Sequence, residues 1–397
     1  MKIILKLLAG MAVGILIGLF APVWAVRLAL TVRELFGDLI QFTIPLIVLF
    51  FVASGIASLP RGSGKLLGRT VGFAYTSTIV AGCIAYFAAR ALIPLFAPAA
   101  ADVPPAAELP APFIAMDVAP LFDVITALVA AFIFGIGISA TGGRTLQTVF
   151  EQGRDVVDRL LGRLIIPLLP FYIAGVFAAR AAEGNVAGTL RIFGTVLVLA
   201  ILLHWAWLGA LFTATGILLA RSPLRLVRLM LPAYVTAAGT MSSAATIPVT
   251  LRSVKSLGIR GPIADFVVPL CANIHLSGST ITIVTCSTAV MLISPDLALP
   301  AFGQMIGVIL MLGAIMIAAP GAPGGAVMSA LGLLTTMLGF SETHLALMIA
   351  LYLAQDSFGT ATNVTGDAVI ALWMDRFFGD QVETPTTEPR SPSAGTS

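Results

Sequence analysis

Residues 320–325 read Pro-Gly-Ala-Pro-Gly-Gly and interrupt a 45-residue stretch, 297–341, that carries no charged side chain. Asp296 and Glu342 bound this stretch on either side. Non-helical backbone at membrane depth is tolerated only where protein buries it or where it lines a cavity. The stretch therefore predicts a re-entrant helical hairpin over residues 298–340.

A second apolar stretch, 229–251, is long enough to span a membrane once, but basic residues flank both of its ends. These residues are Arg221, Arg225 and Arg228 before it, and Arg252, Lys255 and Arg260 after it. Positive charge on both flanks indicates that both ends are cytoplasmic, so we expect another hairpin over 226–255. Two opposed re-entrant hairpins point to a solute site near the midplane of the membrane.

The composition excludes a soluble protein and gives no sign of nucleic-acid binding. Hydrophobic residues make up 58% of the 397 residues, charged residues only 10%, and the mean hydropathy is +1.02. The net charge of +3 reflects the loops. Cys83, Cys271 and Cys286 lie in apolar segments without metal-ligand spacing, so we interpret them as reduced core residues.

The uncharged runs predict the fold class: an all-α integral membrane protein with eight transmembrane helices plus two opposed re-entrant helical hairpins. The first helix is expected to be retained rather than cleaved as a signal peptide. Most Lys and Arg residues fall on the side that holds both termini, which are therefore expected to be cytoplasmic, in a cell (inner) membrane. The expected helices are 3–22, 29–58, 69–96, 119–142, 162–182, 190–220, 262–293 and 343–375.

The last of these helices reads Ala354-Gln-Asp-Ser-Phe-Gly-Thr-Ala-Thr-Asn-Val-Thr-Gly-Asp367. Asp356, Thr360, Asn363 and Asp367 recur at i, i+4, i+7 and i+11, which is one stripe of an α-helix. A carboxylate at membrane depth usually faces a cavity, a cation or a partner. The alternative without a functional role places both aspartates in headgroup water at the helix ends. Neither aspartate has a Lys or Arg on its own helix face, so a cation or a substrate ammonium is the expected partner.

Two more polar segments interrupt the apolar pattern. The first hairpin contains Thr240-Met-Ser-Ser-Ala-Ala-Thr-Ile-Pro248, where exposed N–H groups suit a carboxylate, or where small residues simply pack between helices. The helix that follows contains Pro269-Leu-Cys-Ala-Asn-Ile-His-Leu-Ser-Gly-Ser-Thr280, where an unwound turn would free carbonyl oxygens for Na⁺. His275 is either a proton carrier or a neutral hydrogen-bonding residue. His204 and His344 are expected to be interfacial or packing residues.

Together these segments resemble the dicarboxylate/amino acid:cation symporters, the glutamate-transporter homologues, over essentially the whole chain. The likeness is strongest in Ser242–Pro248 and in Asn363-Val-Thr-Gly-Asp367. The resemblance implies glutamate-transporter-like inverted repeats, a homotrimer and an elevator mechanism. It also implies this division of the chain: scaffold helices at 1–68 and 119–189, a transport domain at 69–96 and 190–379, an extracellular loop at 97–118 and a disordered cytoplasmic tail at 380–397.

The resemblance also implies roles for individual residues. Asp356 would pair with the substrate ammonium, Asn363 and the region of Ser242 and Ser243 would hold its carboxylate, and Thr360 would line the site. The other expected substrate-binding positions are Ser279, Gly321 and Gly359. One Na⁺ site would be formed by Asp367 with carbonyls of Cys271, His275 and Asn363, and a second by carbonyls of Asn273, Ile317 and Ala319. A third would face Ser77, Thr78 and Ser277.

Four positions depart from the family pattern in ways that bear on the substrate and the ions. Members that bind acidic side chains carry an arginine at the position of Gly359, and some carry one at the position of Met241. Burying a second carboxylate without a cation costs several kcal/mol, so we expect a neutral substrate. Ser277 replaces the aspartate, and His275 the asparagine, of the third cation site, so that site is expected to be lost or altered.

The function expected from the sequence is a secondary-active Na⁺-coupled symporter for small neutral amino acids such as serine, threonine or alanine. The alternative on the same fold is a proton-coupled or uncoupled carrier, or an exchanger, of another zwitterion or organic acid, with H⁺ replacing or joining Na⁺. A passive channel is a weaker alternative. An enzyme is not expected, because no nucleophile–base pair or metal-ligand cluster appears at useful spacing.

Overall fold

The computed structural model describes residues 2–57, 64–96, 109–116, 118–184, 186–294, 296–316, 319, 321 and 323–378. Most of the expected loop at 97–118 and all of the expected tail at 380–397 lie outside these residues. Ile317, one of the expected Na⁺ ligands, also lies outside them.

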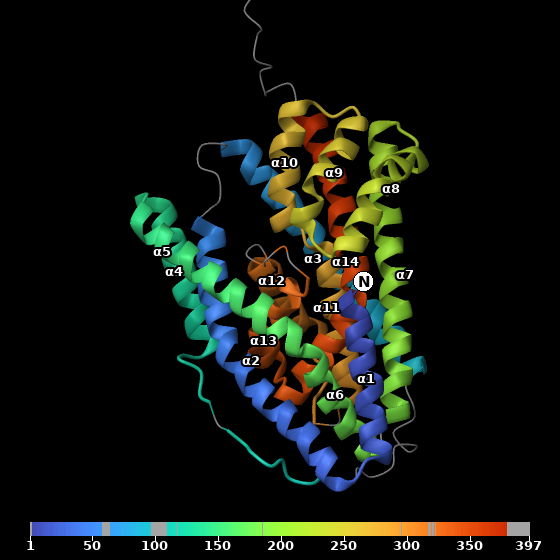
Figure 1. The fold of residues 1–397 in the computed structure, drawn as a ribbon. Helices are drawn as coiled ribbons and strands as arrows, with labels where there is room; N and C mark the ends of the chain where they lie inside the picture. The colour runs from blue at the N-terminus through green and yellow to red at the C-terminus, as the bar shows by residue number, and fades with distance from the viewer. Residues whose placement is uncertain are drawn as a thin grey trace, which may run out of the picture.

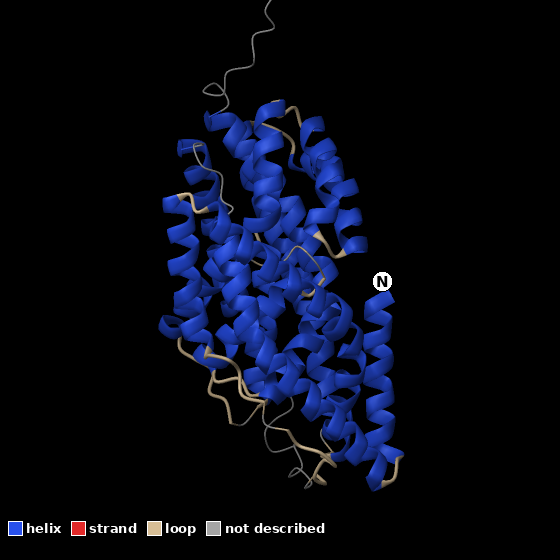
Figure 2. Cartoon of the chain, turned by 60° about the vertical axis from the view of Figure 1, so that its left-hand side comes forward, coloured by secondary structure: helices blue, strands red, loops and turns tan. Residues whose placement is uncertain are grey.

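All regular structure in the described residues is helical, as Figure 2 shows. The first six helices are α1 (Lys2–Phe20), α2 (Val23–Ala57), α3 (Gly64–Phe96), α4 (Val124–Thr141), α5 (Arg144–Leu160) and α6 (Ile166–Ala182), with a π-helix, η2 (Leu161–Ile165), between the last two. The others are α7 (Val186–Leu219), α8 (Pro223–Thr240), α9 (Ser243–Ser256), α10 (Gly261–Ile274), α11 (Ser277–Ile293), α12 (Phe302–Met316), α13 (Gly325–Leu338) and α14 (Glu342–Phe378). The all-α prediction is confirmed.

Six of these segments are long and apolar enough to cross a membrane: Val23–Ala57, Lys65–Phe96, Val124–Thr141, Arg144–Ala182, Val186–Leu219 and Gly261–Ile293. This agrees with a multi-pass membrane protein, whereas the expected number of eight crossings stays a prediction. Helix α5 lies between the expected helices 119–142 and 162–182 and is not among the predicted helices. Phe150 and Val157 are nevertheless buried, seven residues apart on one face of an amphipathic helix.

Both predicted hairpins are helix–turn–helix units. Helix α8 ends at Thr240, and the next residue, Met241, has a left-handed φ of 52°. Ser242 then caps α9 by accepting a hydrogen bond from the Ala245 N–H at 3.2 Å. In the other unit Gly324, with φ of 75°, precedes α13. A side chain there would be strained, which accounts for a glycine at this turn.

The two hairpin tips meet inside the molecule. The Ser242 hydroxyl donates a hydrogen bond to the Gly321 carbonyl, and a Cβ on Gly321 would lie 3.2 Å from Ala244 Cβ. In Figure 1, α8 and α9 occupy the upper part of the molecule, while α12 and α13 approach from below.

The helix predicted at 262–293 is broken between α10 and α11. The His275 N–H still donates to the Cys271 carbonyl at 2.8 Å, but His275 and Leu276 leave helical geometry before α11 begins at Ser277. The unwound turn that the polar residues predicted is therefore present. Such a break leaves carbonyls without helical partners at the end of α10 and N–H groups without partners at the start of α11.

The helices pack in two sets. Helix α1 lies along α6, and α2 packs against α4, α5 and α6. Helix α14 packs against α11, α8, α7 and α10, while α3 lies along α11. Helices α13 and α14 also contact α2 and α6, so the two sets share one continuous apolar core.

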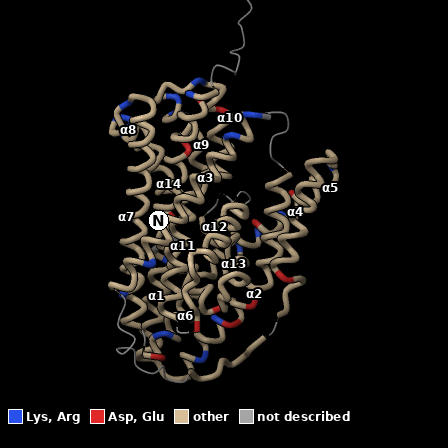
Figure 3. Tube along the Cα trace, turned by 180° about the vertical axis from the view of Figure 1, so that it is seen from behind, with Lys and Arg blue, Asp and Glu red and all other residues tan. Residues whose placement is uncertain are grey.

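Lys and Arg gather at the end of the molecule where α8, α9 and α10 begin or end (Figure 3). This cluster contains the basic residues that flank the first hairpin. Two of them form ion pairs there: Lys255 with Asp265 at 2.7 Å, and Arg260 with Asp375 at 3.2 Å. The hairpin tip therefore points away from the basic end and toward the interior.

Candidate functional site: two buried carboxylates beside a broken helix

Helix α14 brings the predicted polar stripe into the interior. Asp356, Thr360, Asn363 and Asp367 are exposed by only 3%, 6%, 2% and 1%. The structure excludes the alternative in which the two aspartates lie in open surroundings at the helix ends. Tyr352, one turn before Asp356, continues the stripe and is also buried.

Asp356 lies against the second hairpin and is held by neutral donors. Its Oδ2 accepts the Gly324 N–H at 2.7 Å, and its Oδ1 accepts the Thr360 hydroxyl at 3.3 Å. No salt bridge joins Asp356 to any Lys, Arg or His that the structure describes.

Asn363 joins α14 to the start of α11. Its Oδ1 accepts the N–H groups of Gly278 and Ser279 at 2.7 and 3.3 Å, and its Nδ2 donates to Ser279 Oγ at 2.9 Å. The amide therefore satisfies backbone donors that the break in the helix leaves free. The structure thus brings two expected substrate residues, Asn363 and Ser279, into direct contact.

The first hairpin supplies the remaining expected substrate residues. Ser243 is buried, Ser242 is partly buried, and Ser242 contacts Gly321 of the other tip. Gly359 faces α11 rather than open space, since a Cβ on it would lie 3.2 Å from Thr282 Oγ1. A side chain at Gly359 would therefore contact Thr282.

The expected residues of the first and third Na⁺ sites meet at His275. Its Nδ1–H donates to Asp367 Oδ1 at 2.9 Å, and its Nε2 lies 2.9 Å from Ser77 Oγ on α3. Thr78 instead donates to the Ala74 carbonyl of its own helix at 2.9 Å. The Ser277 hydroxyl is buried with no described hydrogen-bond partner.

The described residues of the second Na⁺ site lie at helix ends. Asn273 belongs to the last turn of α10, and Ala319 follows the last residue of α12 by three positions. Carbonyls at helix C-termini lack intrahelical partners and carry partial negative charge, so their chemistry fits a cation. In the same way, the N–H groups at the starts of α9, α11 and α13 suit carboxylates.

Sequence reasoning missed two residues that contact the site. Tyr352 could have been found by extending the α14 stripe back by one turn. His204 is fully buried, with Nε2 at 3.0 Å from the Gly278 carbonyl and 3.1 Å from Thr282 Oγ1. No sequence signal links His204 to the break, because the contact depends on how α7 packs against α11.

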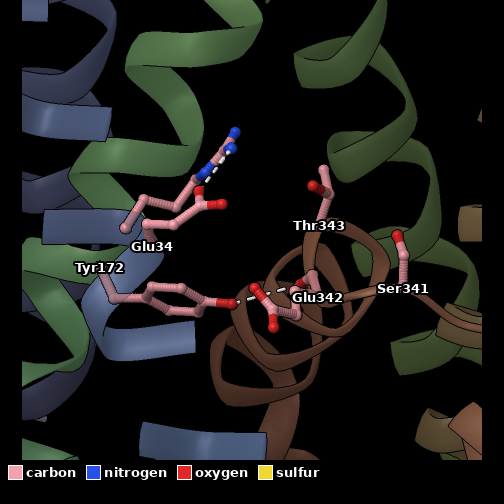
Figure 4. A pocket seen from close by; sticks show the side chains of 6 residues that line it. Glu34, Tyr172, Ser341, Glu342 and Thr343 are labelled. Atoms are coloured by element: carbon pink, nitrogen blue, oxygen red, sulfur yellow. Dashed lines mark hydrogen bonds and ion pairs between the residues drawn. The ribbon is translucent and has the colours of Figure 1, made fainter. Parts of the chain in front are cut away.

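A separate polar cavity of about 320 Å³ lies where α2 and α6 meet the start of α14. Figure 4 shows Glu34, Tyr172, Ser341, Glu342 and Thr343 around it, and Arg33 also contributes to its lining. The Tyr172 hydroxyl donates to the Glu342 carbonyl at 3.2 Å, and Arg33 pairs with Glu34 at 3.1 Å. None of the expected site residues lines this cavity.

Comparison with known proteins identifies the family and several relatives of this chain. The model of the sodium:dicarboxylate symporter family matches residues 3–377. The serine/threonine transporter SstT of Bifidobacterium adolescentis is 27% identical over 396 residues, which cover 93% of this chain and 88% of the relative. The SstT of Streptococcus suis is 29% identical over 302 residues, which cover 71% and 81%.

Mouse excitatory amino acid transporter 4 is 27% identical over 270 residues. This alignment covers 67% of the chain but only 47% of that relative, so the chain matches about half the length of the mammalian protein. The relatives are transporters by name rather than enzymes. The family match extends over nearly the entire chain, which therefore belongs to the sodium:dicarboxylate symporter family.

Proposed function

We propose that this protein is a secondary-active, Na⁺-coupled symporter for small neutral amino acids such as serine, threonine or alanine. The observation that carries the proposal is Asp356, a buried carboxylate with neutral donors and no described cationic partner. A substrate ammonium would supply the missing charge. The name of the SstT relatives, serine/threonine transporter, supports the substrate class.

The neighbourhood of Asp356 favours a neutral substrate side chain. Gly359 supplies no cation, and Thr282 lies close to it. Met241 is likewise uncharged and buried. A second substrate carboxylate would have to be buried without a counter-charge, which costs several kcal/mol. Small side chains that bear at most a hydroxyl fit these surroundings best.

The carboxylate of the substrate is assigned to the tips of the two hairpins. Ser242 and Ser243 begin α9, where backbone N–H groups and the helix dipole favour an anion. Asn363 is the nearest amide of α14 that the family pattern supplies, although its side chain is bonded to Ser279 here. Substrate binding would therefore exchange the Asn363–Ser279 hydrogen bond for a bond to the carboxylate.

The coupled Na⁺ is assigned to the carbonyls of Asn273 and Ala319, together with Ile317. Asn273 lies in the last turn of α10, where carbonyl oxygens lack helical partners, and Ala319 lies three residues beyond the end of α12. Na⁺ held there would neutralise the ends of α10 and α12. Binding of Na⁺ and substrate would thus both depend on the position of the second hairpin.

The mechanism that we propose is an elevator movement in a homotrimer of the inner membrane, with both termini cytoplasmic. Helices α1, α2, α4, α5 and α6 form the scaffold, while α3 and α7 to α14 form the transport domain. The two packing sets and the basic end of the molecule support this division and orientation.

The alternative is a proton-coupled or uncoupled carrier of another zwitterion or organic acid. The hydrogen bond between His275 and Asp367 favours it, since this pair holds a proton where the family would hold a cation. A passive channel has less support, because a passive pore does not need a site that receives both the ammonium and the carboxylate of an amino acid.

Uptake into proteoliposomes tests the proposal. Radiolabelled serine, threonine, alanine and aspartate are offered under an inward Na⁺ gradient and, separately, under an inward proton gradient. We expect uptake of the neutral amino acids under the Na⁺ gradient and little uptake of aspartate. Uptake driven only by protons would support the alternative, and absence of uptake for all four would contradict both.

A further inference from the structure

The imidazole of His275 lies between residues that the family pattern assigns to two different cation sites. Its Nδ1 is 2.9 Å from Asp367 Oδ1, and its Nε2 is 2.9 Å from Ser77 Oγ. Asp367 is the only acidic residue expected in the first site, and Ser77 is a member of the third. The His275 side chain therefore makes hydrogen-bond contacts with a member of the first cation site and with a member of the third.

The ring of His275 is enclosed and packs closely against α14. The side chains of His275 and Asp367 are exposed by 0% and 1%. A Cβ on Gly366 would lie 2.7 Å from His275 Cε1, so the ring already rests against the backbone of α14. Asparagine, which the family pattern has at this position, is smaller and would leave room next to Asp367.

The chemistry of the imidazole also opposes Na⁺. Na⁺ is a hard cation and prefers oxygen ligands. His275 instead places its Nδ1–H against Asp367 and its Nε2 against Ser77. That N–H gives the buried carboxylate the hydrogen bond that it needs to avoid a desolvation penalty. The Cys271 carbonyl, another expected ligand, already accepts the His275 backbone N–H at 2.8 Å.

The remaining residues of the first and third cation sites do not replace the oxygen ligands that His275 makes unavailable to Na⁺. Ser277 brings a neutral hydroxyl where the family pattern has a carboxylate, and Thr78 donates its hydroxyl to Ala74. Asn273 and Ala319 differ from them, because neither contacts His275 in any described hydrogen bond. The second Na⁺ site is thus independent of the ring.

We propose that His275 closes the first and third cation positions, so that one Na⁺, at the hairpin site near Asn273 and Ala319, accompanies each substrate. This inference rests on the proposed function for the presence of any Na⁺ coupling. The part of the inference that concerns the closure of the first and third cation positions rests only on the contacts among His275, Asp367 and Ser77. His275 is therefore the residue that sets the ion stoichiometry of this carrier.

The test compares the Na⁺ dependence of serine uptake in wild type, His275→Asn and Thr288→Ala. We expect a Hill coefficient for Na⁺ of about 1 in wild type that rises toward about 2 in His275→Asn, because the coefficient is bounded by the number of sites. Thr288→Ala removes one buried hydrogen bond, from the Thr288 hydroxyl to the Val284 carbonyl on α11, and leaves His275 in place, so it should respond to Na⁺ like wild type. An unchanged Na⁺ response in His275→Asn would overturn the inference.

A measurement on the wild type covers the case in which His275→Asn does not fold. The reversal potential of serine transport in proteoliposomes, at varied Na⁺ gradients, gives the number of Na⁺ ions per serine. One ion supports the closure, and two or more contradict it. If serine uptake by the wild type does not depend on Na⁺, the proposal that the protein is a Na⁺-coupled symporter fails. In that case, where His275→Asn folds, the closure is judged by whether Na⁺ raises the thermal unfolding temperature of His275→Asn but not that of Thr288→Ala.

Discussion

Asp356 and Asp367 are the same residue type, eleven positions apart on one helix, and both are almost fully buried. Neutral groups hold Asp356: the Gly324 N–H and the Thr360 hydroxyl. Asp367 instead has the imidazole of His275, which Ser77 supports from the other side. The first carboxylate has no cationic partner among the described residues, whereas the second has the imidazole of His275 as its partner.

This difference shows that burial alone does not identify a transport ligand. A buried carboxylate always needs hydrogen bonds, and it also needs a positive charge or a proton. Where the protein supplies that partner, the carboxylate contributes to stability. Where the protein does not, the substrate or ion supplies it, and the carboxylate contributes to binding. Substitutions at the two positions should therefore affect different measurements.

The largest effect on binding is expected from Asp356→Asn. Removing one partner of a buried charge pair typically costs 2 kcal/mol or more, so serine affinity should fall by about 30-fold or more. Isothermal titration of purified protein with serine measures the loss. The folded state should survive, because Asn keeps an oxygen that can accept the Gly324 N–H. Serine affinity within threefold of wild type would refute the ammonium assignment.

Asp367→Asn should show the reverse pattern. The substitution weakens the buried hydrogen bond to His275, at a cost to stability of about 1–3 kcal/mol. Thermal unfolding in detergent should detect a lower midpoint, while serine affinity changes much less than in Asp356→Asn. If Asp367→Asn instead abolishes serine binding and leaves the unfolding midpoint unchanged, the comparison between the two carboxylates is wrong.

A cation placed near Asp356 should change the preferred substrate. Gly359→Arg, combined with Thr282→Ala to make room for the new Cβ, is expected to increase competition by aspartate against labelled serine. Thr282→Ala alone is the matched control and should leave aspartate a poor competitor. No gain in aspartate competition by the double variant would place the side-chain pocket elsewhere.

The smallest effect is expected at the contact between the hairpin tips. Ser242→Ala removes both the cap of α9 and the hydrogen bond to Gly321, a loss of about 1 kcal/mol, or about fivefold in the serine KM. Ser256→Ala, at the other end of α9, removes a local bond to the Ser253 carbonyl and is the control. Equal effects of the two substitutions on KM would argue against a role of the tip in the site.

Much of the fold could be predicted from the sequence, because membrane burial imposes long apolar runs and charged boundaries. The hairpin turns followed from Pro320–Gly325 and from the basic flanks of α8 and α9. Helix α5 was missed, since an amphipathic helix of charged and apolar residues resembles a polar connection. Its burial of Phe150 and Val157 depends on neighbouring helices that no local pattern reveals.

The candidate site was predictable along one helix and not between helices. The α14 stripe follows from helical period, and all four of its residues are buried. The bond between His275 and Asp367 joins residues 92 positions apart and depends on the rotation of α10 relative to α14. The close approach of Gly359 to Thr282 likewise depends on how α14 packs against α11.

The central claim, that Asp356 receives the ammonium of the substrate, is tested most directly by a pair of ligands that differ in that group. The binding of L-serine and of 3-hydroxypropanoate, which lacks the ammonium, is measured for wild type and Asp356→Asn. The account predicts that wild type prefers serine by about 30-fold or more and that this preference falls below about threefold in the variant. An undiminished preference in Asp356→Asn would contradict it.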